Sequence, residues 1–143
     1  MTRLVVAAAI LERDGRILIT RRLKGTHLEG VWEFPGGKCE PGETLEACLG
    51  RELFEELGIT AVIGRELLTT SHAYDDRVVE LHFLTCTSDD EPKPLLNQEM
   101  RWAARNELAG LEFPPADAEL IQWLSDTSGG TSAANGSATT VAS

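Results

Sequence analysis

The sequence predicts an α/β protein in which a β-sheet is packed between helices. Apolar runs at residues 3–12 and 16–22 are separated by Asp14-Gly15, a dipeptide typical of β-hairpins. An amphipathic helix pattern follows, and further strand patterns and a last helix pattern come after it. Because strands flank the central helix in the sequence, we expect a helix–sheet–helix sandwich.

The remaining elements can be placed in chain order. Residues 25–41 are rich in Gly and Pro and predict a loop, interrupted by a short apolar piece at 31–34. Residues 43–57 show the helix pattern, which ends at Gly58, a residue common just after helices. The later elements are strands at 67–72, 78–87 and 100–103 and a helix at 116–124.

Size and charge limit the possible functions. The chain has 143 residues, which suits one domain. Its 13 Lys and Arg against 23 Asp and Glu give a formal net charge of −10. Nonspecific binding to nucleic acids or anionic membranes relies on basic patches, so this charge argues against both partners. Divalent cations could still bridge the acidic chain to phosphate groups.

Composition divides the chain at residue 124. Residues 125–143 are mostly Ser, Thr, Gly, Ala and Asn, which bury too little apolar surface to offset ordering entropy, so we expect a disordered tail after a domain at 1–124. The longest apolar run, 4–11, is far shorter than the roughly 20 residues that span a bilayer. Glu12 and Arg13 follow it where a signal-peptide cleavage site would have small residues.

The three cysteines, Cys39, Cys48 and Cys86, are odd in number and widely spaced, and they form no C-x-x-C pair. This pattern predicts neither a disulfide framework nor a zinc site. We expect reduced thiols and a soluble protein located in the cytoplasm.

The most informative segment is the central helix, which carries Glu52, Glu55 and Glu56 on one face. Glu-rich helix faces are often plain solvated surface, which is one interpretation. The other is a divalent-cation site, since like charges at this spacing repel and oxygen ligands suit Mg²⁺. Gly36-Gly37 lies just before the helix, where a carbonyl could reach a metal, and an ion pair of Arg51 with Glu43 could fix the acidic face.

This segment resembles the Nudix hydrolases, which carry G-x5-E-x7-R-E-U-x-E-E-x-G-U, where U is a bulky aliphatic residue. Every specified position is filled, by Gly37, Glu43, Arg51, Glu52, Leu53, Glu55, Glu56, Gly58 and Ile59. The resemblance implies a Nudix α/β/α sandwich with a central mixed β-sheet. It also implies Mg²⁺-dependent hydrolysis of a nucleoside diphosphate linked to another moiety, with Mn²⁺ as an alternative metal.

The resemblance also implies roles for the acidic residues. Glu52, Glu55, Glu56 and the Gly36 carbonyl would hold the metal, with Glu52 as the base. Arg51 and Glu43 would hold the helix face in register. Family members often have a further metal-binding Glu six residues before a Trp like Trp102, but Leu96 stands there. Nearby Glu99 could replace it as ligand or base, or could be plain surface.

Outside this motif, residues 3–124 are similar to the MutT branch, which removes oxidised nucleotides such as 8-oxo-dGTP. The similarity implies substrate-binding roles for Arg22, His27, Glu33, Phe34, Pro35, Gly36, Tyr74, Arg77 and Asp117. Surface roles for Arg22 and His27, and core packing for Tyr74, remain open alternatives.

Asp117 departs from the MutT pattern, which has Asn at this position to read the purine edge. An ionised Asp only accepts hydrogen bonds, so it could bind guanine N–H groups or the cytosine amino group, whereas a protonated Asp could mimic Asn. Asp117 could also simply cap the last helix. Nudix enzymes that hydrolyse CTP and dCTP share this Asp.

Three functions follow as hypotheses. The first is a nucleoside triphosphate pyrophosphohydrolase that converts 8-oxo-dGTP to the monophosphate and diphosphate and so prevents mutation. The second is a CTP/dCTP pyrophosphohydrolase, and the third is a non-catalytic nucleotide-binding regulator. The sequence makes no prediction of oligomeric state.

Overall fold

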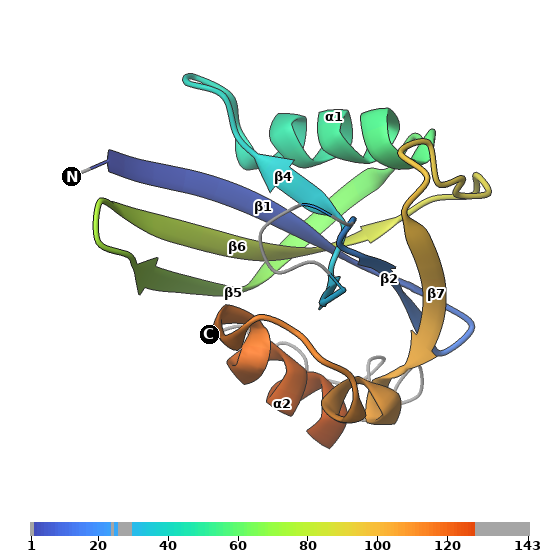
Figure 1. Cartoon of the computed structure of the whole chain (residues 1–143). Helices are drawn as coiled ribbons and strands as arrows, with labels where there is room; N and C mark the ends of the chain where they lie inside the picture. The colour runs from blue at the N-terminus through green and yellow to red at the C-terminus, as the bar shows by residue number, and fades with distance from the viewer. Residues whose placement is uncertain (1, 24, 26–29, 128–143) are drawn as a thin grey trace.

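The computed structural model describes residues 2–23, 25 and 30–127. In this part of the chain, a seven-stranded mixed sheet lies between helix α1 (Leu45–Leu57) and helix α2 (Ala118–Asp126), one on each face (Figure 1). The predicted sandwich is therefore confirmed. The strands are β1 (Thr2–Arg13), β2 (Arg16–Arg21), β3 (Trp32–Glu33), β4 (Gly36–Lys38), β5 (Val62–Ala73), β6 (Arg77–Thr87) and β7 (Glu99–Ala104).

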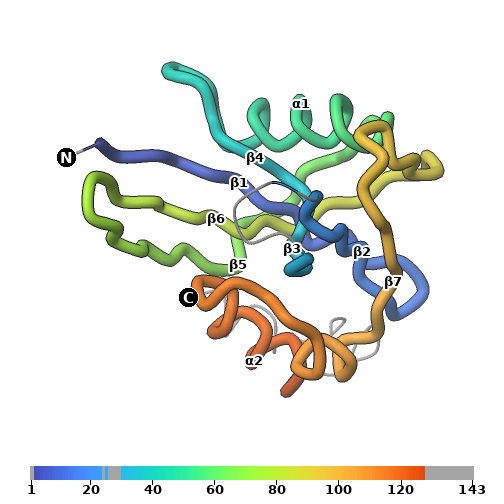
Figure 2. Tube along the Cα trace, viewed as in Figure 1, coloured from blue at the N-terminus to red at the C-terminus, as the bar shows by residue number. Residues whose placement is uncertain are grey.

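β1 is the central strand, and its pairing makes the sheet mixed. It runs parallel to β6, from Thr2 opposite Arg77 to Leu11 opposite Cys86, and antiparallel to both β2 and β4. Beyond β6 lies β5, while β2 also pairs with β3 and β7 (Figure 2). The turn between β1 and β2 is the predicted hairpin, with positive φ at both Asp14 and Gly15.

Helix α1 has a well-defined cap at each end. The Thr44 side chain accepts a hydrogen bond from the Ala47 N–H, and Gly58 closes the helix in the left-handed conformation at φ 69°. The helix was predicted from residue 43, but it begins at Leu45. Glu43 lies in the preceding turn because Thr44, the N-cap, has an extended backbone.

Several other boundaries differ from the prediction. β3 and β4 fall within the predicted loop at 25–41, and they are too short to show an alternating pattern. β5 starts at Val62 rather than residue 67, since its first half pairs irregularly with β6. The last helix begins as a 3₁₀ turn at Pro115–Asp117, and a further 3₁₀ helix, Arg105–Gly110, was not predicted.

Each face of the sheet has its own apolar core. The face toward α1 buries Leu11 and Leu18 against Leu49, Leu53 and Leu57 of the helix. The opposite core lies between the sheet and α2 and contains Ile10, Ile19, Phe83, Leu120 and Leu124. Both helices are thus anchored by buried aliphatic side chains, which fixes the position of their remaining faces.

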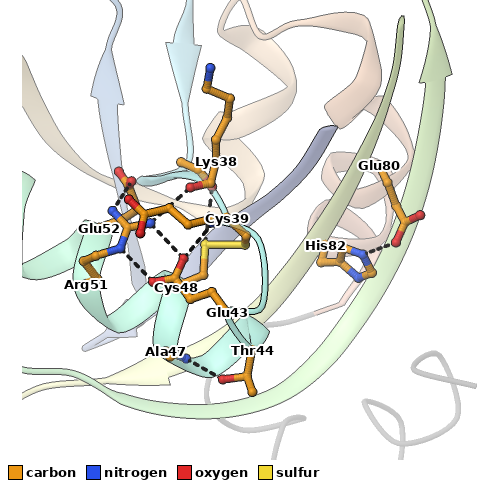
Figure 3. Close-up of a disulfide and its surroundings, with 12 residues drawn as sticks. Lys38, Cys39, Glu43, Thr44, Ala47, Cys48, Arg51, Glu52, Glu80 and His82 are labelled. Atoms are coloured by element: carbon orange, nitrogen blue, oxygen red, sulfur yellow. Dashed lines mark hydrogen bonds and ion pairs between the residues drawn. A yellow bond between two sulfur atoms is a disulfide. The ribbon is translucent and has the colours of Figure 1, made fainter. Parts of the chain in front are cut away.

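The prediction of three reduced thiols is wrong for two of them. Cys39 and Cys48 form a disulfide, with their Cα atoms 5.1 Å apart (Figure 3). Cys86 is free and buried. The fold brings the end of β4 against α1, a proximity that cysteine spacing alone does not reveal.

The C-terminal boundary is only partly within the structure. Ser125 and Asp126 belong to α2, and the expected tail from residue 128 onward lies outside the described residues. Within the described ranges, none of the helices combines the length and the apolar character needed to cross a membrane.

Candidate active site

The site is centred where β4 crosses the acidic face of α1. The two glycines of β4 allow this close approach. A Cβ on Gly37 would lie 2.3 Å from the Glu52 Oε1 atom, and one on Gly36 would lie 2.0 Å from the Ala7 carbonyl oxygen. A larger residue at position 37 would displace the Glu52 carboxylate, so the glycine pair directly positions the acidic face.

Arg51 organises the acidic residues around it (Figure 3). Its guanidinium donates two hydrogen bonds to Glu43, at 2.7 and 3.0 Å, and further bonds to Glu52 at 2.9 Å and Glu55 at 3.2 Å. It also donates to the Lys38 carbonyl at 3.1 Å, which ties α1 to β4. The predicted pairing of Arg51 with Glu43 is thus present in the structure.

The same network sets the protonation of Glu43. The hydrogen bonds from Arg51, with a further one from the Glu40 N–H, lower the pKa of Glu43 to about 2. The Glu43 and Glu52 carboxylates in turn raise the pKa of Arg51. Both groups are therefore charged throughout the neutral range.

Glu56 is in the opposite situation. Its pKa is raised to about 8, mainly by burial and also by its hydrogen bond with the Glu52 carboxyl and the nearby charges of Glu52 and Glu33, while the Gly36 backbone opposes the rise. Two carboxyl groups thus share a partly buried position, and a proton is favoured there in the absence of another positive charge.

The Glu52 and Glu56 carboxyl groups are the side chains that could bind a metal ion here. Among the described residues, no three His, Cys, Asp or Glu side chains close around one point. Glu52 and Glu56 come together, but Glu55 points to Arg51 and its side chain is 57% exposed. The oxygen donors of Glu52 and Glu56, where a proton is favoured in the absence of another positive charge, fit a hard divalent cation.

A cavity of about 460 Å³ extends from Glu56 to the start of α2. It brings together seven of the predicted site residues, which are Arg22, Glu33, Phe34, Gly36, Glu56, Tyr74 and Asp117. Val6, Ala8 and Phe83 also line it, although the sequence did not single them out. The alternation of β1 places Val6 and Ala8 on one face of the sheet, and this pattern could have revealed them.

Asp117 lines this cavity directly before the start of α2, and it is only 5% exposed. Its side chain forms no capping hydrogen bond to α2, which argues against the simple cap interpretation. Burial, together with the charge of Glu33, raises its pKa to about 7. Glu33 therefore influences both Glu56 and Asp117.

Glu33 itself combines burial with an ion pair. Its pKa is raised by burial, and Arg22, whose Nη1 donates to the carboxylate at 2.8 Å, limits the rise. Arg22 and Glu33 thus form a charged pair in the wall of the cavity. Phe34 has a partly structural role, since its ring stacks on Phe113 and meets Phe83 edge to face.

Tyr74 and Pro35 differ in their surroundings. Tyr74 is 41% exposed and contacts the guanidinium of Arg77, which is not part of the cavity lining. The Pro35 carbonyl accepts a hydrogen bond from Ala9 and so belongs to the backbone pairing of the sheet. His27 lies outside the described residues.

Glu99 does not join the acidic cluster in this structure. Its carboxylate forms an ion pair with Arg21 at 3.3 Å, and its side chain is 58% exposed. This exposed position supports the interpretation of Glu99 as plain surface rather than as a metal ligand or base.

With this geometry established, comparison with known proteins identifies the family. The NUDIX domain family matches residues 6–123. The chain belongs to the Nudix hydrolases. It is 35% identical over 128 residues to a CTP pyrophosphohydrolase from Escherichia coli, covering 85% of this chain and 91% of the relative.

Two further relatives show that this Nudix hydrolase is MutT-like. An 8-oxo-dGTP diphosphatase from Haemophilus influenzae is 37% identical over 121 residues, covering 83% of this chain and 89% of the relative. The solution structure of MutT from methicillin-resistant Staphylococcus aureus superimposes with a TM-score of 0.74 at 34% identity, covering 88% of this chain and 98% of that one. The protein is thus a hydrolase of phosphoric anhydride bonds, in a family that generally uses divalent metals.

Proposed function

We propose that the protein is a Mg²⁺-dependent nucleoside triphosphate pyrophosphohydrolase of the cytoplasm that converts 8-oxo-dGTP to 8-oxo-dGMP and diphosphate, and so prevents mutation. The observation that carries the proposal is the continuous cavity from Glu56 on the acidic helix to the buried Asp117. Its two ends differ in chemistry in the way that a nucleotide does. The acidic end suits metal-bridged phosphates, and the apolar end with one buried carboxyl suits a base.

At the acidic end, Glu52, Glu56 and the Gly36 carbonyl would hold the metal, with Glu55 joining after it leaves Arg51. When bound, Mg²⁺ neutralises charge on the phosphate oxygens and lowers the pKa of water. Glu52 would accept the proton of the water that attacks the β-phosphorus, which releases the monophosphate and diphosphate. Arg51 and Glu43 would keep the Glu52 carboxylate in position without touching substrate.

At the other end, Asp117 would read the base, with Arg22 and Glu33 in the adjacent wall and the backbone of residues 34–36 beneath the nucleotide. A protonated Asp117 offers a donor and an acceptor, as Asn does, and its raised pKa makes this form accessible near neutral pH. We place 8-oxo-guanine here on that basis. Tyr74, Arg77 and His27 would also contact the nucleotide.

CTP or dCTP is the second candidate substrate. It is favoured by Asp117 in its ionised form, which would accept from the cytosine amino group. The relative named CTP pyrophosphohydrolase, at 35% identity, adds support.

A non-catalytic regulator is the alternative of another class. It would need neither the Arg51 network nor the charge conflict between Glu52 and Glu56, both of which the structure retains. We therefore favour catalysis.

One assay separates these possibilities. Diphosphate release is measured with Mg²⁺ for 8-oxo-dGTP, dGTP, dCTP and CTP, with a Glu56→Gln variant as the inactive control. The proposal requires the highest kcat/KM for 8-oxo-dGTP. A higher kcat/KM for CTP or dCTP would show that one of these is the substrate instead of 8-oxo-dGTP. If no nucleotide is hydrolysed, the non-catalytic regulator is the remaining hypothesis.

A further inference from the structure

The Cys39–Cys48 disulfide spans the junction on which the acidic site is built. Cys39 directly follows β4, and Cys48 lies in α1 with its side chain buried. The Gly37 carbonyl lies 3.7 Å from the Cys48 sulfur. The bond therefore joins the end of β4 to α1 (Figure 3), close to Gly37.

The helix transmits this constraint to the carboxylates. Glu52 and Glu56 follow Cys48 by one and two helical turns, so the three residues share one side of α1. On the strand, Gly37 precedes Cys39 by two residues and packs directly against the Glu52 carboxylate. Any change in the spacing of β4 and α1 at the disulfide would thus move the two halves of the site relative to one another.

The bond is not needed to hold the two elements together. The hydrogen bond from Arg51 to the Lys38 carbonyl joins the same segments, and Leu49, Leu53 and Leu57 anchor α1 in the core. Loss of the bond would therefore change the spacing of β4 and α1 without unfolding the domain, because two thiols cannot approach as closely as two bonded sulfurs.

The exposure of the three cysteines is also suited to selective oxidation. Cys39 is partly exposed, so it is the most accessible of the three cysteines to an oxidant in solution. Cys48 is buried beside it and can act only on its neighbour. Cys86 is buried elsewhere in the core, and burial raises the pKa of its thiol to about 12, which makes it unreactive.

We propose that Cys39 and Cys48 form a reversible redox site that sets the metal affinity of the acidic face. Hydrogen peroxide would oxidise the Cys39 thiol to a sulfenic acid with release of water. The Cys48 thiol would then attack the Cys39 sulfur and expel a second water, forming the disulfide. A dithiol would reverse the reaction and be oxidised itself. The oxidised form would hold β4 and α1 in the metal-binding arrangement, and reduction would relax it.

This inference rests on the proposed metal-dependent function. The experiment therefore measures the state of the Cys39–Cys48 disulfide, metal binding and turnover separately. Full-length protein is treated with peroxide or with dithiothreitol and then freed of reagent. Thiols are counted after denaturation, Mn²⁺ binding is titrated by electron paramagnetic resonance without nucleotide, and diphosphate release is assayed last. We expect one thiol in the oxidised protein and three in the reduced protein.

Reduction should weaken Mn²⁺ binding about 3–10-fold, with the circular dichroism spectrum of the folded protein retained. Cys39→Ser should bind Mn²⁺ as the reduced protein does under both treatments, whereas Cys86→Ser, the matched control, should still respond to peroxide. Three thiols after peroxide treatment, or equal Mn²⁺ affinity in both states, would overturn the redox site even if nucleotide hydrolysis is normal. Absence of Mn²⁺ binding in both states would overturn the proposed metal site together with this inference.

Discussion

The two helices cover opposite faces of one sheet but differ in what they present beyond the core. Helix α1 is anchored by Leu49, Leu53 and Leu57, and its outer side carries an ordered set of charges around Arg51. Helix α2 is anchored by Leu120 and Leu124, and in the described residues it carries no comparable charge network. Of the two helices, α1 therefore carries the ordered charges, at the proposed metal site.

This contrast separates stability from activity. Charge changes on α1 should impair turnover while the fold persists, since the aliphatic anchor is untouched. Truncation of side chains in the core under α2 should lower the free energy of unfolding, while the molecules that remain folded should keep their turnover. Asp117, at the start of α2, is where the two effects should meet.

The largest expected effect is on the acidic helix. Glu56→Gln removes a carboxylate from the proposed metal set and should lower kcat by about 100-fold or more. The melting temperature should stay equal or rise, because the conflict with Glu52 is relieved. Diphosphate release and thermal unfolding measure the two outcomes, and Glu46→Gln, an exposed change on the same helix, is the matched control. Turnover like that of the wild type would contradict the metal assignment.

The second prediction tests the opposite core. Leu124→Ala should lower the free energy of unfolding by about 2–5 kcal/mol, since Leu124 is fully buried. Urea denaturation measures this, with the exposed Gln122→Ala as control. At a temperature where both proteins are folded, kcat should match the wild type. A loss of kcat as large as that of Glu56→Gln would break the distinction between the helices.

The third prediction concerns the residue that joins base reading to α2. Asp117→Ala should raise KM for the preferred nucleotide about 10-fold and change kcat less, because a base contact is lost while the phosphate end remains. KM and kcat for purine and pyrimidine triphosphates measure this. An unchanged KM for every nucleotide would remove Asp117 from the base site.

Asp117 also predicts a pH dependence. Its pKa is about 7 in the fold against 3.8 normally, so the folded state binds more protons between these values. The contribution of Asp117 to stability should therefore fall as pH rises from about 4 to 7. Asp117→Asn should lose this component in unfolding experiments across that range, and an identical pH profile would contradict the shift.

The smallest effect is expected at Glu43, whose pKa is lowered from 4.5 to about 2. The stabilisation it gains from Arg51 is present above pH 4.5 and is lost as pH falls toward 2. Glu43→Gln should therefore show a shallower loss of stability in acid than the wild type. Acid titration followed by circular dichroism tests this, and equal slopes would argue against the ion pair in solution.

The sequence predicted what depends on local pattern. The span of α1 followed from its apolar spacing and Gly58, and the nearness of Arg51 to Glu43 followed from the motif. The disulfide did not, because Cys39 and Cys48 meet only once β4 packs on α1. Nor could a pattern show that Glu55 turns to Arg51, since a helical face fixes the direction of a side chain but not its partner. β3 and β4 are too short for their alternation to be visible.

The parallel pairing of β1 with β6 bears on how the protein is made. The acidic helix and the glycines and cysteines beside it are synthesised before any of residues 77–87, so β1 cannot pair with its parallel neighbour β6 until more than half of the chain has been made. During that interval the hydrophobic side of the helix has no complete sheet to cover it.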